Sequence, residues 1–283
     1  MKQQKINEFK FNINKFNIKN TFLKLTKYTV PYNTEPILEN LLPKKIKKDE
    51  FGNYYYRIGK SKTMFTAHLD DVSWDNEIVN HKTVNDFIRT DGSTILGADD
   101  KAGVTILLYM IYKRVPGTYY FFIGEEHGMV GSKGIIRLKK KWFSDNFKRC
   151  ISFDRKGYGS IISSQLGQIC CSNEFIDSLI KEYGKYNLLH RNDPTGVFTD
   201  SAAFIGIIPE CTNISVGYFN EHSNNERQNI VYLDLLSKAS SKIKWDNLPS
   251  PGITKNPQNY NNNNNNDYYD EYGEYGDFDN IFD

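Results

Sequence analysis

The hydrophobic positions of the chain fall into short apolar runs separated by longer segments with helical spacing. Four runs of five to seven residues are too short for typical helices and predict buried strands, at 63–67, 118–123, 149–153 and 212–218. Apolar residues at helical spacing, together with capping and stop signals, predict helices at 21–29, 34–42, 104–113, 132–142, 173–183, 200–205 and 232–243. We also expect a hairpin over 49–59, two edge strands over 77–89 and a strand over 160–164. Strands that alternate with helices are typical of the α/β class.

Acidic residues or histidines follow each of the four apolar runs. The first run leads into His68-Leu69-Asp70-Asp71 and the second into Gly124-Glu125-Glu126. The third ends at Asp154, and His222 lies just past the fourth. Ligands of open α/β sheets bind beyond the carboxyl ends of the strands. We therefore expect these side chains to gather at one edge of the sheet.

A fifth position lies in the stretch Leu96-Gly97-Ala98-Asp99-Asp100-Lys101-Ala102-Gly103, directly before an apolar helix. An Asp at such a junction can cap the helix, because its oxygens accept hydrogen bonds from unpaired N–H groups. Capping needs only one carboxylate, however, and two adjacent ones repel each other. The pair Asp99-Asp100 therefore favours a bound cation.

These imidazole and carboxylate groups form a mixed ligand set that suits zinc, cobalt or manganese better than calcium or copper. Two metal ions about 3.5–4 Å apart need a carboxylate between them, because the cations otherwise repel. Asp99 is the candidate for that bridge, since His and acid pairs flank it in the sequence.

The motifs, in this order, resemble those of the co-catalytic zinc aminopeptidase/carboxypeptidase superfamily, which includes leucyl aminopeptidases and glutamate carboxypeptidases. The resemblance covers about residues 60–230 and rests on His68-Leu69-Asp70, Gly97–Gly103, Glu125–Ser132, Asp154 and His222-Ser223. It implies a three-layer α/β/α fold with a central mixed, mostly parallel sheet. Residues 155–221 show ordinary α/β elements. We therefore expect a single domain without the inserted lid or dimerisation domain of some branches.

The resemblance also implies roles for individual residues. His68, Asp99 and Asp154 would hold one metal ion, and His222, Asp99 and Glu126 the other. Glu125 would be the general base, and Asp70 would orient the imidazole of His68. The metal pair would activate a bridging water as hydroxide for attack on an amide bond.

Three further residues are candidates for substrate contacts, each with an ordinary structural alternative. Arg155 could meet a substrate carboxylate or be solvated. Asp200, in Thr199-Asp200-Ser201, could touch substrate or cap the next helix. Tyr218 could donate a hydrogen bond to the developing oxyanion or pack as a core aromatic.

The composition is that of a globular protein and does not indicate a particular binding partner. The chain has 283 residues, of which 39% are hydrophobic, enough to fill a core. Its net charge of +2 gives no indication of nucleic-acid or membrane binding. No apolar run approaches the roughly 20 residues of a membrane-spanning helix. Four cysteines without metal-site spacing, and no leader-like start, predict a cytoplasmic protein.

The chain divides by composition into three parts. Residues 1–20 form a predicted N-terminal arm and residues 21–246 the catalytic domain. Residues 247–283, with three prolines, an Asn run and seven acids, cannot bury a core and predict a disordered tail.

We therefore expect a di-metal-dependent exopeptidase that acts on small peptides, with an aminopeptidase as the leading candidate. The alternatives on the same metal centre are an N-acyl amino acid deacylase and a carboxypeptidase. A metal-binding interaction protein without catalysis is a third hypothesis, which the low-complexity tail motivates.

Overall fold

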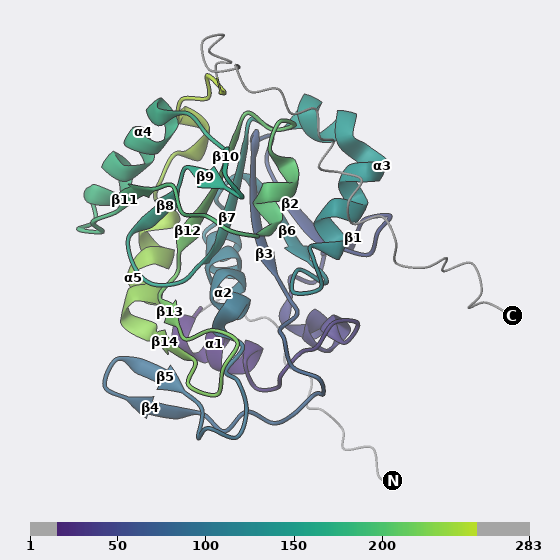
Figure 1. Ribbon diagram of the computed structural model, residues 1–283, viewed down its shortest axis with the longest axis vertical. Coiled ribbons are helices and arrows are strands. Elements are labelled where there is room, and N and C mark those ends of the chain that lie inside the picture. Colours follow the sequence, from purple (N-terminus) through teal and green to yellow (C-terminus); the bar gives the residue numbers. More distant parts are fainter. Residues whose placement is uncertain (1–15, 254–283) are drawn as a thin grey trace, which may run out of the picture. The chain divides into compact units, whose positions relative to one another are not determined.

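The computed structural model describes residues 16–253, and its centre is a mixed sheet of eight strands (Figure 1). In order across the sheet these strands are β1 Lys47–Lys48, β2 Tyr54–Ile58, β6 Gly117–Phe122, β3 Thr63–His68, β7 Arg149–Arg155, β12 Glu210–Ser215, β8 Ser160–Ile162 and β11 Arg191–Asp193. The neighbours β6, β3, β7 and β12 are parallel to one another. Their carboxyl ends therefore meet at one edge of the sheet. β2 and β8 join this parallel centre in the antiparallel direction.

Helices cover both faces of the sheet, which confirms the expected three-layer α/β class in a single domain. On one face α1 Ile18–Leu25, α2 Ala98–Tyr112 and α5 Ile230–Ser240 pack against one another, and α2 lies on β3 and β7. On the other face α3 Val130–Asn146 packs with the 3₁₀ helix η2 Asp200–Phe204, which lies on β7 and β12. α4 Asn173–Gly184 packs against β11 at the end of the sheet. Two further 3₁₀ helices are η1 Glu35–Leu41 and η3 Trp245–Asn247.

A second, smaller sheet lies beside the carboxyl ends of the central strands. Its order is β13 Tyr218–Phe219, β14 Arg227–Asn229, β5 Phe87–Arg89 and β4 Lys82–Val84, all antiparallel. A separate pair is β9 Ser164–Gln165 with β10 Gln168–Ile169. The two strands expected over 77–89 are thus present, although they are shorter and belong to this second sheet.

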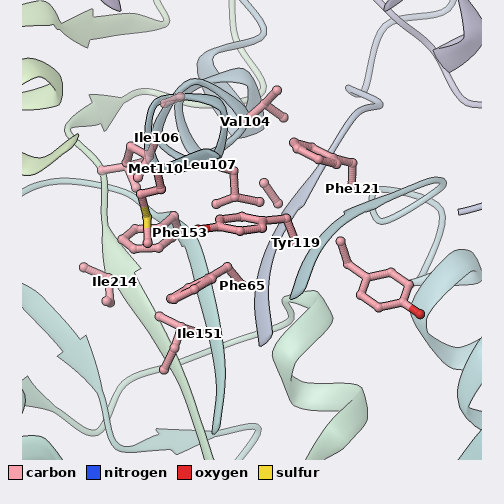
Figure 2. Close-up of a cluster of buried hydrophobic side chains, with 14 of the residues drawn as sticks. Phe65, Val104, Ile106, Leu107, Met110, Tyr119, Phe121, Ile151, Phe153 and Ile214 are labelled. Carbon is pink, nitrogen blue, oxygen red and sulfur yellow. The ribbon is translucent and has the colours of Figure 1, made fainter. Parts of the chain in front are cut away.

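Buried apolar side chains fill the space between α2 and the parallel strands (Figure 2). Helix α2 is buried along nearly its whole length, which agrees with its apolar character on every side. Leu107 and Met110 of α2 face a layer of aromatic rings that includes Phe65, Tyr119 and Phe153. This packing fixes the start of α2 against the ends of the strands, where the candidate ligands lie.

Local sequence signals placed some element boundaries incorrectly. Ser132 was expected to cap the helix over 132–142, but α3 begins earlier, after Met129 in the left-handed conformation (φ 62°). Ser132 lies inside the first turn of α3, completely buried. The helices expected over 34–42 and 200–205 are 3₁₀ helices.

The folded body extends past residue 246, where the tail was expected to start. Leu248 is buried, and its carbonyl accepts a hydrogen bond from the guanidinium of Arg149. The N–H of Gly252 donates to Glu210 over 2.8 Å. At the other end, α1 begins at Ile18, within the predicted arm, with Asn17 as its N-cap. The predictions for residues 1–15 and 254–283 lie outside the described residues.

None of the helices in the described part of the chain is both long and apolar enough to cross a bilayer.

Candidate metal centre

His68 is the last residue of β3, and Asp70 fixes the orientation of its ring. The Nδ1 atom of His68 lies 3.1 Å from the carbonyl oxygen of Asp70 and 3.5 Å from its carboxylate. These contacts leave Nε2 of His68 to face the side chains at the carboxyl ends of the neighbouring strands. The carboxylate of Asp70 also accepts hydrogen bonds from the N–H groups of Glu125 (3.0 Å) and Glu126 (3.1 Å). Asp70 therefore holds the imidazole and the loop of the glutamate pair in one arrangement.

The carboxylate of Asp99 lies between the two histidines. Its Oδ1 is 3.2 Å from Nε2 of His68, and its Oδ2 is 3.4 Å from Nε2 of His222. The same nitrogen of each imidazole also lies near a second carboxylate: Asp154 Oδ1 is 3.7 Å from His68 Nε2, and Glu126 Oε1 is 2.8 Å from His222 Nε2. The peptide bond between Asp99 and Asp100 is cis.

Three groups of potential ligand atoms lie within 4.8 Å of one another: His68/Asp99/Asp154, Asp99/Glu126/His222 and His68/Glu125/Glu126. The first two coincide with the two sets predicted from the sequence, and they share Asp99. Their donors are imidazole nitrogens and carboxylate oxygens, which suit zinc, cobalt or manganese. Four carboxylates around two imidazoles carry excess negative charge in a largely buried place. The residues therefore fit a pair of divalent cations.

The protonation of these groups reflects burial and mutual repulsion. Burial, together with the charge of Asp99, raises the pKa of Asp154 to about 7. Burial also raises the pKa of Glu125 well above its usual value, and the carboxylates of Asp154, Asp200 and Glu126 raise it further. Hydrogen bonds to Asp99 and Glu126 raise the pKa of His222 to about 11. Each shift expresses a shortage of positive charge in the site.

Four of the five candidate ligands line a cleft of about 340 Å³: Asp99, Glu126, Asp154 and His222. Two exposed apolar side chains, Val197 and Phe198, also line it, each 59% exposed. Besides His222, the basic side chains of Arg155 and Lys156 lie in the lining, and each already has a partner. Arg155 donates to the carbonyl and hydroxyl oxygens of Thr195 (3.2 and 3.1 Å), and Lys156 donates to Glu221 over 2.6 Å.

The three candidate substrate contacts lie in different surroundings. Arg155 lines the cleft, but the loop at Thr195 holds its guanidinium. Tyr218 also lines the cleft, and its hydroxyl donates to the carbonyl oxygen (3.0 Å) and carboxylate (3.1 Å) of Asp154. Asp200 is only 2% exposed and is not among the residues that line the cleft. Burial raises the pKa of Asp200 to about 7.

Asp100 lies beneath the site, fully buried. Its carboxylate accepts hydrogen bonds from the N–H groups of Gly103 (3.0 Å) and His68 (3.3 Å). Asp100 thus caps the start of α2 while Asp99 faces the histidines. Burial, together with the charge of Asp154, raises the pKa of Asp100 well above its usual value.

Several supporting residues were missed by the sequence analysis. Asn213 and Thr199 hold Asp154, through the backbone N–H (2.8 Å) and the carboxylate (2.8 Å) respectively. Lys101 pairs with Asp71 in the core, and Glu226 holds the backbone before Asp99. Two sequence features could have indicated these residues. Lys101 is a charged residue at the start of an apolar helix, and Glu226 is an acid four residues after His222.

The chain resembles several solved peptidases in fold. No family model matches it. The structure aligns with aminopeptidase PepT from Bacillus cereus (TM-score 0.68, 16% identity, 79% of this chain and 96% of that one). It also aligns with a tripeptidase from Staphylococcus aureus (0.63, 18%, 79% and 96%) and with the TET1 peptidase of Pyrococcus horikoshii (0.62, 15%, 80% and 98%).

One curated sequence is similar over a short stretch. The uncharacterized protein YqjE of Bacillus subtilis is 41% identical over 80 residues, which is 26% of this chain. The matched stretch spans about a fifth (21%) of the length of that relative. At these identities, the solved structures show that the chain shares the three-layer fold of these peptidases.

Proposed function

We propose that the chain is a di-metal-dependent exopeptidase, specifically an aminopeptidase that acts on small peptides. The observation that carries the proposal is the placement of Asp99, whose two oxygens face His68 and His222 in two overlapping ligand sets. His68, Asp99 and Asp154 would hold one ion, and Asp99, Glu126 and His222 the other. Zinc fits these donors, as do cobalt and manganese. The neighbours in fold, which are named as an aminopeptidase, a tripeptidase and a TET peptidase, support the peptidase class.

Bound metal ions would supply Lewis acidity that polarises the scissile carbonyl and lowers the pKa of water. The protein supplies the proton transfers through Glu125. Its carboxylate lines the cleft and accepts no hydrogen bond from any side chain or backbone group of residues 16–253. Glu125 is therefore free to take a proton from the attacking water and to deliver it to the leaving amine. The hydrogen bond from the backbone N–H of Glu125 to the carboxylate of Asp70 holds the backbone that carries this side chain.

The charges around the cleft favour a substrate with a free amino terminus. The substrates of carboxypeptidases and N-acyl amino acid deacylases carry a free carboxylate, and these enzymes need a cation that can bind it. Both cleft cations are engaged, Arg155 with Thr195 and Lys156 with Glu221. Glu221, the partner of Lys156, also lines the cleft, so these two residues leave no net positive charge there for a substrate carboxylate. This charge balance favours an aminopeptidase over the two alternatives.

The four cysteines are free and buried, as expected for a reducing compartment such as the cytoplasm.

The test compares substrates that differ only in which end is blocked. The purified full chain, loaded with zinc, cobalt or manganese, is given aminoacyl amides, N-acetylated peptides and peptides amidated at the C-terminus. We expect cleavage of the amides and of C-terminally amidated peptides, and loss of cleavage on N-acetylation. Cleavage of only the N-acetylated substrates would contradict the aminopeptidase assignment.

The proton-transfer role is tested by Glu125→Gln, with Glu210→Gln as the control. Glu210 is also a buried glutamate, but it bonds to Ser172 and Gly252 away from the cleft. We expect kcat to fall about 10²- to 10⁴-fold in Glu125→Gln, with two metal ions still bound, and to change little in the control. An unchanged kcat in Glu125→Gln would refute the mechanism.

A further inference from the structure

Glu226 is a buried acid that holds the backbone of the segment leading to Asp99. Its side chain is almost completely inaccessible to solvent, at 1% exposure. Oε2 accepts hydrogen bonds from the N–H groups of Leu96 (2.8 Å) and Gly97 (2.7 Å), and Oε1 accepts one from the N–H of Asp99 (3.0 Å). One carboxylate thus gathers three donors from four consecutive residues.

The backbone here needs such a partner because it is irregular. Gly97 is left-handed (φ 67°), and Asp99 and Asp100 have non-helical dihedral angles although they stand at the start of α2. The helix therefore cannot satisfy these N–H groups itself, and any of them left unpaired in the core would destabilise the fold. An ionised carboxylate accepts all three, whereas a glutamine amide offers one acceptor oxygen and turns its NH₂ group toward a donor.

The segment that contains Glu226 also carries a candidate ligand. His222 lies four residues before Glu226, and its Nε2 faces Oδ2 of Asp99. Glu226 therefore ties the segment 222–226 to the segment 96–99 at the point where both approach the centre of the site. On the other side, a Cβ at Gly97 would lie 3.0 Å from Oδ2 of Asp71, so the backbone is confined there too.

We propose that Glu226 is a positioning residue, which sets Asp99 so that one oxygen serves each of two metal ions. This inference rests on the proposed di-metal function. Glu226 does not contact the candidate ligand atoms themselves, because its bonds go to backbone N–H groups. Removing its charge-assisted bonds should let the Asp99 carboxylate turn away from the shared position and weaken the pairing of the metals.

The chain offers a matched control for this proposal. Glu210 is also completely buried, and its carboxylate accepts three hydrogen bonds, from the N–H (2.7 Å) and hydroxyl (3.0 Å) of Ser172 and from the N–H of Gly252 (2.8 Å). Glu226→Gln and Glu210→Gln remove comparable bonds. Both should lower the melting temperature, but only the first should change metal binding.

The experiment titrates the metal-free full chain with Zn²⁺ in competition with a chromophoric chelator, and follows Co²⁺ absorption in parallel. Wild type and Glu210→Gln should each bind two ions with matching affinities. In Glu226→Gln the affinity for at least one ion should fall about 10- to 100-fold, and Glu226→Asp, which keeps the charge, should restore part of it. Two ions bound by Glu226→Gln with wild-type affinity would overturn the positioning role alone. Failure of wild type to bind two ions would overturn the proposed function as well.

A measurement on the wild type covers the case in which the variants do not fold. If Glu226 positions the segment, the amide protons of Leu96, Gly97 and Asp99 should already exchange slowly in the metal-free protein. Protection that arises only after zinc is added would show that the metal orders the segment, and it would overturn the inference.

Discussion

Asp99 and Asp100 are adjacent carboxylates with opposite surroundings. Asp99 presents one oxygen to each imidazole, whereas Asp100 turns beneath the site and accepts from Gly103 and His68 N–H groups. Burial favours the neutral form of Asp100, since it raises the pKa of that acid well above its usual value. Two adjacent aspartates thus take different positions: Asp99 is a candidate ligand, and Asp100 supports the backbone next to it.

This division predicts unequal effects of two conservative substitutions. Asp99→Asn replaces one of the two acceptor oxygens with an NH₂ group, so the variant should bind at most one metal ion tightly. Asp100→Asn resembles the neutral acid and should keep two ions, with a smaller loss of affinity. Metal content after dialysis, measured by atomic absorption, distinguishes the variants. Equal losses in both would contradict the assignment of the bridge to Asp99.

A second residue-scale prediction concerns His190, which lies away from the candidate ligands. Its ring packs against that of Tyr183 in a tilted arrangement, with 4.4 Å between centroids, and burial lowers its pKa to about 4. In the unfolded chain the pKa should be near 6.5, so unfolding takes up a proton between these values. His190 therefore contributes stability that is complete above about pH 6.5 and is lost as the pH falls through about 4.

The measurement is the free energy of unfolding against pH, for wild type and His190→Gln under the same metal conditions. Between pH 7 and 4 the wild type should lose more stability than the variant, by on the order of 3 kcal/mol. Other titrating groups are common to both proteins, so the difference isolates His190. Parallel curves would mean that His190 charges without cost in the folded state.

At this scale the sequence predicted the acids and histidines that meet at the site, and it missed what holds them. His68, Glu126, Asp154 and His222 were identifiable because reactive side chains follow apolar runs in an α/β pattern. Glu226 carries no such signal: its partners lie 127 to 130 residues earlier in the chain. Its role depends on an irregular backbone that local propensity does not describe.

Among the elements, α2 depends on an ion pair at its first turn. The ammonium group of Lys101 is fully buried and lies 2.8 Å from Oδ2 of Asp71. It also donates to the carbonyl oxygen of Asp70 over 3.2 Å. Burial alone would raise the pKa of Asp71, but the charge and hydrogen bond of Lys101, together with hydrogen bonds from Ser73 and Val30, outweigh burial and lower that pKa. The pair thus joins the start of α2 to the end of β3, next to His68.

Breaking this pair should be costly. Lys101→Met leaves Asp71 buried without its counter-charge, and we expect the free energy of unfolding to fall by about 3–5 kcal/mol. The double variant Lys101→Met/Asp71→Asn should recover part of that loss, because no isolated charge remains. Urea unfolding of the full chain gives both values. A loss below about 1 kcal/mol in the single variant would show that water reaches the pair.

The type of an element was predicted correctly where its hydrophobic pattern was strong. Predicted boundaries were wrong where the backbone conformation determined them. The buried strands β3, β6, β7 and β12 were all expected, since short apolar runs define them. α3 begins two residues before the expected cap, after Met129 in a left-handed conformation that side-chain chemistry did not indicate. Leu248 packs into the core although Pro249 and Pro251 follow it, so composition alone misplaced the end of the folded body.

For the molecule as a whole, the site joins five segments that are far apart in the sequence. The end of β3, the start of α2, the loop after β6, the end of β7 and the loop after β13 each contribute one or two candidate ligands. The carboxylates of Asp99, Glu125, Glu126 and Asp154 repel one another without a counter-ion, and this repulsion adds to burial in raising the pKa of Asp154 and of Glu125. Cations bound there would remove that repulsion and connect the five segments.

Metal loading should therefore stabilise the entire fold. A ligand that binds only the folded state at 100 times its Kd adds about 2.7 kcal/mol to the free energy of unfolding. For a domain of this size, that corresponds to a rise in Tm of about 5–10 °C. We expect this rise when Zn²⁺, Co²⁺ or Mn²⁺ is added to chelator-treated protein, and its reversal by EDTA. In Asp154→Asn the rise should be smaller, because one ligand set is impaired, whereas in Glu210→Gln, whose carboxylate bonds away from the cleft, it should be preserved. A Tm that none of the three metals changes would count against a metal centre at this edge of the sheet, whatever the catalytic activity.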